Sequence, residues 1–107
     1  MRLFNLSNFI GGWFVGNFLP TTITTESVEV AIKRYNKGDT ERSHYHLLAD
    51  EITVIVEGSV KMNGVVYTKN DILHIEKSES TDFLALEDCI TCVVKMPSVV
   101  GDKYICE

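Results

Sequence analysis

The sequence lacks an apolar run long enough to cross a membrane. Its most apolar stretch, residues 1–20, is broken by three asparagines and a glycine pair, whereas a spanning helix needs about 20 consecutive apolar residues. The same stretch has neither a continuous apolar segment nor a small-residue cleavage site of the kind that a secretory signal carries. We therefore expect residues 1–20 to pack on or across the fold, no membrane association, and a cytoplasmic location.

Clustered basic residues are also missing. The chain has 10 Lys and Arg against 15 Asp and Glu, a formal net charge of -5, and its basic residues are scattered. A surface that follows nucleic-acid phosphates needs a basic patch or stripe. The composition therefore argues against nucleic acid as a partner.

Cysteine is scarce, and the three residues present make an odd number. Cys89 and Cys92 lie in strand-like sequence, where an offset of three residues places them on opposite faces, about 10 Å apart. A disulfide cannot span that distance, and no second pair accompanies them to suggest a zinc motif. We predict buried or half-buried free cysteines in a reducing compartment.

Helical periodicity is absent, and short strand signals replace it. Residues 27–35 alternate Val28, Val30 and Ile32 with other side chains, which is the period of a half-buried strand. Asn63-Gly64 is the favoured pair for a tight hairpin turn. Further strand-like segments are 13–18, the segment that carries His44 and His46, 51–58, 71–76, 81–87 and 90–96. With no linker or internal repeat, residues 1–107 are predicted to form a single all-β domain, a sandwich or barrel.

Two histidines and a glutamate have the spacing of a metal site. His44 and His46 leave the same face of a strand, about 7 Å apart along the chain. Glu51 follows a short bend and opens the next strand. Imidazole and carboxylate groups bind divalent Fe, Mn, Ni or Zn without selecting among them. We predict a divalent metal ion held by these three residues.

The same residues carry a resemblance to a family. Gly38, His44, His46, Glu51 and Gly58, with five, one, four and six residues between them, resemble the complete first motif of the cupins. The resemblance covers roughly residues 27–96. It implies a jelly-roll barrel of antiparallel strands with the metal inside.

The second cupin motif is not retained. Its Gly, Pro, Gly, His and Asn correspond here to Asn70, Glu76, Ser78, Thr81 and Ala85. Thr81 therefore stands where the family has its fourth metal ligand. Three protein ligands would leave coordination positions open for water, substrate or dioxygen.

Five more side chains are candidates for the wall of a pocket. Thr81 could hydrogen-bond a bound water, and Thr53 shares the face of Glu51 by strand parity. Tyr35 and Arg34 are candidates for the barrel mouth, where an arginine could hold a substrate carboxylate. His74 is expected in the core or the pocket wall.

Two classes of function stay open, because cupin-like folds host many activities. In the first, a metal ion activates water or dioxygen, or polarises a carbonyl, in isomerase- or dioxygenase-type chemistry on a small polar molecule. In the second, the same pocket is metal-free and serves a non-catalytic small-molecule binder or a structural module. The resemblance also implies a homodimer, for which Trp13 and Phe14 supply aromatic surface.

Overall fold

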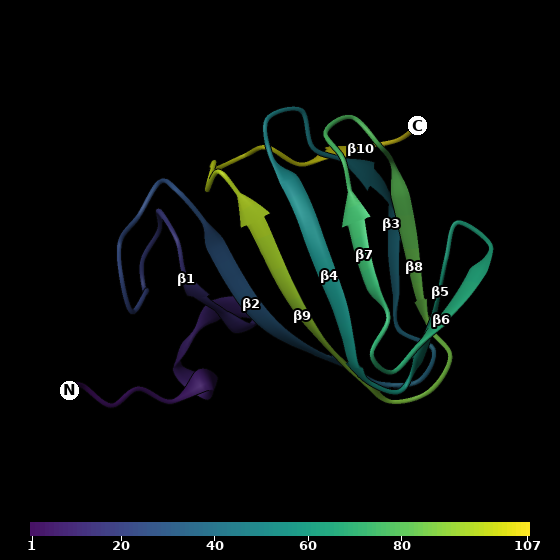
Figure 1. The fold of residues 1–107 in the computed structure, drawn as a ribbon, viewed down its shortest axis with the longest axis horizontal. Helices are drawn as coiled ribbons and strands as arrows, with labels where there is room; N and C mark the ends of the chain where they lie inside the picture. Colours follow the sequence, from purple (N-terminus) through teal and green to yellow (C-terminus); the bar gives the residue numbers. More distant parts are fainter.

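A computed structural model describes all 107 residues, which form two antiparallel five-stranded sheets that face each other (Figure 1). The first sheet runs β1 (Trp13–Val15), β2 (Glu29–Tyr35), β9 (Cys89–Met96), β4 (Asp50–Glu57) and β7 (Ile72–Ile75). The second runs β10 (Tyr104–Ile105), β3 (Thr40–Tyr45), β8 (Thr81–Ala85), β5 (Ser59–Met62) and β6 (Val65–Thr68). The only helical segments are two 3-10 turns, η1 (Leu6–Asn8) and η2 (Ile10–Gly12). The predicted antiparallel jelly-roll barrel is confirmed.

Two tight turns show why the strands end where they do. Asn63 and Gly64 join β5 to β6 with φ values of 50° and 80°, as the hairpin signal predicted. Gly58 ends β4 at φ 86°, where an added Cβ would lie 2.5 Å from the carbonyl oxygen of Asp88. Only glycine allows the chain to pass so close to the turn between β8 and β9.

The N-terminal region lies along the outer edge of the first sheet. β1 pairs with β2, and the carbonyl of Ile32 lies against Gly12. The strand predicted over 13–18 is shorter than expected, since it ends at Val15 and Gly16 makes only an isolated bridge to Thr24. No helix in the protein has the length and apolar character to cross a bilayer.

Apolar side chains fill one end of the barrel. Ile55 and Val60 are fully buried there. They belong to a cluster completed by Met62, Ile75, Phe83, Ala85 and Cys89. The cysteines are free, with Cys89 buried and Cys92 and Cys106 half-buried. The other end of the barrel is lined differently.

Candidate ligand-binding cavity

A cavity of about 360 Å³ opens between the two sheets beyond the apolar cluster. Its size falls in the range of small-molecule sites. Strands β2, β3, β4, β8 and β9 contribute to its wall, together with N-terminal residues and the segment 99–103. The polar and charged lining residues are Glu29, Lys33, Tyr35, Glu41, His44, His46, Glu51, Thr53, Thr81, Thr91, Lys95, Asp102 and Lys103.

Six of the side chains singled out in the sequence line this cavity: His44, His46, Glu51, Thr53, Thr81 and Tyr35. His44 pairs directly with Thr81 across β3 and β8, so the two side chains leave the same face of the second sheet. Thr81 therefore lies opposite the first histidine of the motif. His46 follows the last residue of β3 and is 6 % exposed.

Arg34 and His74 are not part of this cavity, which corrects the expectation for both. Arg34 is the register partner of Ile90, and His74 is the partner of Ile52. Inward-facing positions on β2 and β7 are the alternate ones, among them Tyr35 and Ile75. Strand parity thus sends Arg34 and His74 to the outer face of the sheet, where both are exposed.

The two imidazoles of the motif lie edge to face, with ring centres 5.4 Å apart. Nδ1 of His44 donates to the carbonyl oxygen of Arg42 at 2.9 Å, which leaves its Nε2 as the free ring nitrogen. Burial lowers the pKa of His46 to about 4, with smaller contributions from the Lys95 ammonium and from His44. His46 is therefore neutral at pH 7, and its ring can both donate and accept a hydrogen bond.

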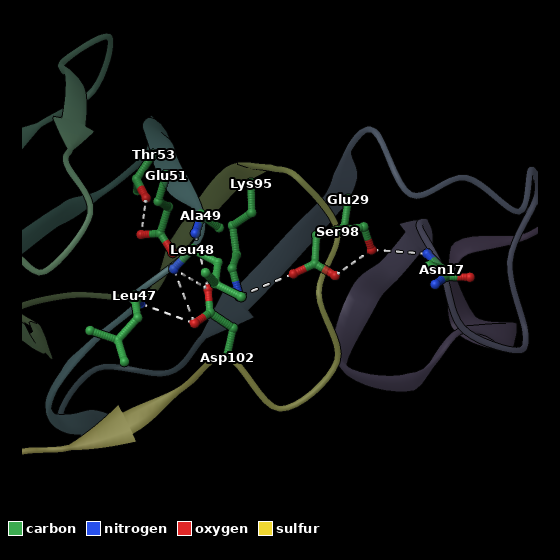
Figure 2. Close-up of polar contacts among 10 residues, drawn as sticks. All are labelled: Asn17, Glu29, Leu47, Leu48, Ala49, Glu51, Thr53, Lys95, Ser98 and Asp102. Atoms are coloured by element: carbon green, nitrogen blue, oxygen red, sulfur yellow. Dashed lines mark hydrogen bonds and ion pairs between the residues drawn. The ribbon is translucent and has the colours of Figure 1, made fainter.

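The three predicted metal ligands do not form a metal-holding group. No three His, Cys, Asp or Glu side chains in the protein are arranged to share one ion. The carboxylate of Glu51 instead accepts a hydrogen bond from Oγ1 of Thr53 at 3.0 Å (Figure 2). As they lie, the donors of His44, His46 and Glu51 are not grouped around a single point.

A buried ion pair stands in the same cavity. Nζ of Lys95 lies 3.0 Å from Oε1 of Glu29, and both side chains are about one-tenth exposed. The other oxygen of Glu29 accepts from Oγ of Ser98 at 3.0 Å, and that hydroxyl accepts from the backbone N–H of Asn17 at 2.9 Å (Figure 2). The chain of contacts fixes the glutamate, because each polar atom has a partner.

A second lysine faces the cavity beside an aromatic ring. Nζ of Lys33 lies 5.4 Å from the centre of the Trp13 ring, and Nζ of Lys95 lies 5.6 Å from it. Lys33 also approaches Glu41 at 3.7 Å, and that carboxylate accepts from the hydroxyl of Tyr35 at 3.0 Å. Burial, followed by the charge of Glu41, raises the pKa of Tyr35 far above its ordinary value. The phenol therefore stays a hydrogen-bond donor at neutral pH.

The C-terminal segment closes one side of the cavity and is anchored by Asp102. This carboxylate is 3 % exposed and accepts from the backbone N–H groups of Leu47, Leu48 and Ala49 at 3.0 to 3.2 Å (Figure 2). Those three residues are the bend between His46 and Glu51. Asp102 thus holds the loop that separates the two.

One buried hydroxyl in the cavity wall has no partner. Oγ1 of Thr91 makes no hydrogen bond, although the residue is 1 % exposed. It is the one buried side-chain polar atom of the protein left in this state. Buried polar atoms are nearly always satisfied, so a hydroxyl without a protein partner sets this position of the cavity wall apart.

Sequence reasoning missed Glu29, Lys95, Ser98 and Asp102. In a strand of alternating pattern, lysine and glutamate are predicted to face solvent, since both are rarely buried unless paired. Their partners come from strands or segments far apart in the sequence. The one available signal was parity, because Lys95 shares the face of Thr91 and Val93 on β9.

No protein-family model matches the sequence, and no curated protein matches it significantly. Solved structures do resemble it. An uncharacterised conserved protein with a double-stranded β-helix domain from Klebsiella pneumoniae superposes with a TM-score of 0.72 at 18 % identity, covering 99 % of this chain and 92 % of that one. The chain has the cupin fold.

Two further cupin-fold structures are similar over about two thirds of the chain. KdgF from Halomonas gives a TM-score of 0.64 at 20 % identity, covering 70 % of this chain and 74 % of its own. A cupin-superfamily sugar phosphate isomerase from Silicibacter pomeroyi gives 0.62 at 17 % identity, covering 67 % and 52 %. At such identities the likeness concerns the fold, and function has to be argued from the cavity.

Proposed function

We propose that this cupin binds a small, hydroxyl-rich polar molecule of about monosaccharide size in its cavity, without a resident metal. A cavity large enough for such a molecule, with convergent polar side chains in its wall, carries the proposal, and the unpartnered hydroxyl of Thr91 lies in that wall. Neutral His46, the phenol of Tyr35 and three threonines supply donors and acceptors around it. Such convergent polar groups give a pocket its specificity.

The charge and shape of the wall narrow the class of ligand. Four carboxylates and three ammonium groups line the cavity, so their charges nearly cancel, and neither a strong anion nor a strong cation is favoured. The Trp13 ring adds an aromatic surface against which the C–H face of a sugar ring can pack. The structure from Silicibacter pomeroyi, described as a sugar phosphate isomerase, supports a sugar-related ligand for a barrel of this fold.

The cupin resemblance suggested a divalent Fe, Mn, Ni or Zn ion at His44, His46 and Glu51. We assign these side chains instead to direct contact with the ligand, since their donors are not arranged around one ion. Whether binding leads on to catalysis depends on the ligand. His46 is the group placed to exchange a proton with it.

The test uses Trp13, the single tryptophan of the chain, as a reporter in the cavity wall. Purified protein is titrated with a panel of neutral hexoses, hexuronates and hexosamines while tryptophan fluorescence and imidazole NMR shifts are followed. We expect saturable changes with at least one neutral member, weakened by Thr91→Val and unaffected by Thr68→Val on the exposed strand β6. A panel without saturable change in either signal contradicts the proposal.

We also propose that the protein is a cytoplasmic homodimer. The outer face of the first sheet supports this, because Val54 there lies between Cys92 and Ile72, and Ile72 is 67 % exposed. Continuous apolar surface of this kind is uncommon on soluble monomers. Three free cysteines suit a reducing compartment. A monomer mass by light scattering at micromolar concentration would refute the dimer.

A further inference from the structure

The side chain of Lys95 lies at the centre of a row of charges across the first sheet. In the register of β2, β9 and β4, Lys95 pairs with Glu29 on one side and with Glu51 on the other. Register partners in neighbouring strands project to the same face, and all three residues line the cavity. In the register of the sheet Lys95 therefore lies between two glutamates, in the cavity that also holds His44 and His46, and its ammonium pairs with Glu29.

This ammonium is held in place. Its Nζ pairs with Oε1 of Glu29 at 3.0 Å, and Glu29 is itself fixed by Ser98. A buried charge is costly unless it is paired and hydrogen-bonded, and this arrangement satisfies that requirement without any ion from solution. A divalent cation entering beside it would meet a like charge and find one of the nearest carboxylates already engaged.

We propose that the Lys95 ammonium is the built-in cation of this barrel, occupying the role in the cavity that the cupin resemblance assigned to a metal ion. One of its three N–H donors is directed at Glu29, and two remain for lone pairs of a ligand oxygen. It acts as a binding residue that presents positive charge to a hydroxyl or carbonyl oxygen. This role belongs to Lys95 alone and is the same whichever molecule the cavity takes.

Lys33 provides a matched control. Lys33 lies on β2, faces the cavity and, like Lys95, contacts the ring of Trp13. Its register partner on β9 is Thr91, and the next residue along that row on β4 is Ile55. Its row contains no carboxylate, and the one carboxylate beside it, that of Glu41 at 3.7 Å, still accepts from Tyr35 when the charge of Lys33 is removed.

The experiment measures Zn²⁺ affinity by competition with a chromophoric chelator in the full chain and in Lys95→Met and Lys33→Met. We expect Lys95→Met to bind one Zn²⁺ at least about tenfold more tightly than the parent, because one like charge is removed and the carboxylate of Glu29 is released. Lys33→Met should bind as the parent does. Adding His44→Ala and His46→Ala to Lys95→Met should remove the gain.

Lys95→Gln guards against loss of the fold, since its amide keeps a hydrogen-bond donor one atom short of the position of Nζ while the charge is lost. It should show the same gain in Zn²⁺ affinity with an unchanged β-type circular dichroism spectrum. Equal Zn²⁺ affinity in the parent and both Lys95 variants, whether tight or absent, overturns the inference, and so does an equal gain in Lys33→Met. Sugar binding is scored separately by Trp13 fluorescence, so the failure of one proposal is distinguishable from the failure of the other.

Discussion

The two ends of the barrel are built from the same strands and yet differ in chemistry. Along β9 the inward positions change from Cys89 in the apolar cluster to Thr91 and then Lys95 in the cavity. β4 runs antiparallel to β9, and its inward positions change from Ile55 in the cluster to Thr53 and then Glu51 in the cavity. The fold is therefore stabilised by apolar packing at one end, while the other end keeps polar groups whose partners must be supplied individually.

The difference shows how a small protein separates stability from binding. A well-packed apolar cluster loses free energy whenever volume is removed. In a polar wall, removing a hydrogen-bonded group lowers the free energy of unfolding, whereas removing a group without a partner changes it little. The following substitutions test that contrast, in order of decreasing effect.

The largest effect is expected at the apolar end. Ile55→Ala removes a side chain with no exposed surface and should lower the free energy of unfolding by about 3 kcal/mol through lost burial and a residual cavity. Urea denaturation measures the change. Val56→Ala, on the opposite face and 38 % exposed, should cost less than about 1 kcal/mol. Equal losses for the two variants would contradict the assignment of this end as the stabilising core.

At the polar end, Asp102 should matter most for stability. Asp102→Ala leaves the N–H groups of Leu47, Leu48 and Ala49 without their acceptor, at a cost of about 2 to 3 kcal/mol. Asp102→Asn keeps one acceptor oxygen and should lose less. Faster hydrogen exchange at these three amides in Asp102→Ala is the specific readout. Unchanged exchange would show that the C-terminal segment does not anchor this loop.

Lowering the pH should reduce the free energy of unfolding through protonation of His46 at the polar end. Its folded pKa of about 4 lies below the ordinary value near 6.5, so the unfolded chain binds the extra proton first as the pH falls. The contribution of neutral His46 to the free energy of unfolding is complete above about pH 6.5 and is lost progressively toward pH 4. Between pH 7 and pH 5 the free energy of unfolding should fall by about 1 to 2 kcal/mol. Denaturation at several pH values measures this slope. His46→Gln should flatten it over that interval, and an unaltered slope would assign the effect to other groups.

The smallest effect on stability is expected at Thr91. Thr91→Val replaces an unpartnered buried hydroxyl with a methyl group of similar size, so the free energy of unfolding should change by less than about 0.5 kcal/mol in either direction. Thermal unfolding provides the measurement. A loss well above 1 kcal/mol would mean that the hydroxyl is already bonded in the free protein, most simply to a buried water.

Particular residues show which features of the structure could be predicted from the sequence. Alternation and the Asn63-Gly64 pair were sufficient for antiparallel strands and their hairpin, because side-chain period and turn geometry are local properties. His44, His46 and Glu51, from whose spacing a metal site was predicted, line one cavity, since the spacing combines same-face positions with a short bend. His74 and Arg34 were misplaced, because an isolated strand does not reveal which of its faces turns inward.

The sequence by itself determined an all-β barrel with a polar cavity near the two histidines. Only the tertiary structure decided what that cavity contains. Lys95 meets Glu29 across 66 positions of sequence, as the numbering shows, and Asp102 reaches a loop 53 to 55 residues away. Local patterns report the preferences of a chain segment, whereas a buried charge is tolerated or excluded according to the partner that folding brings to it.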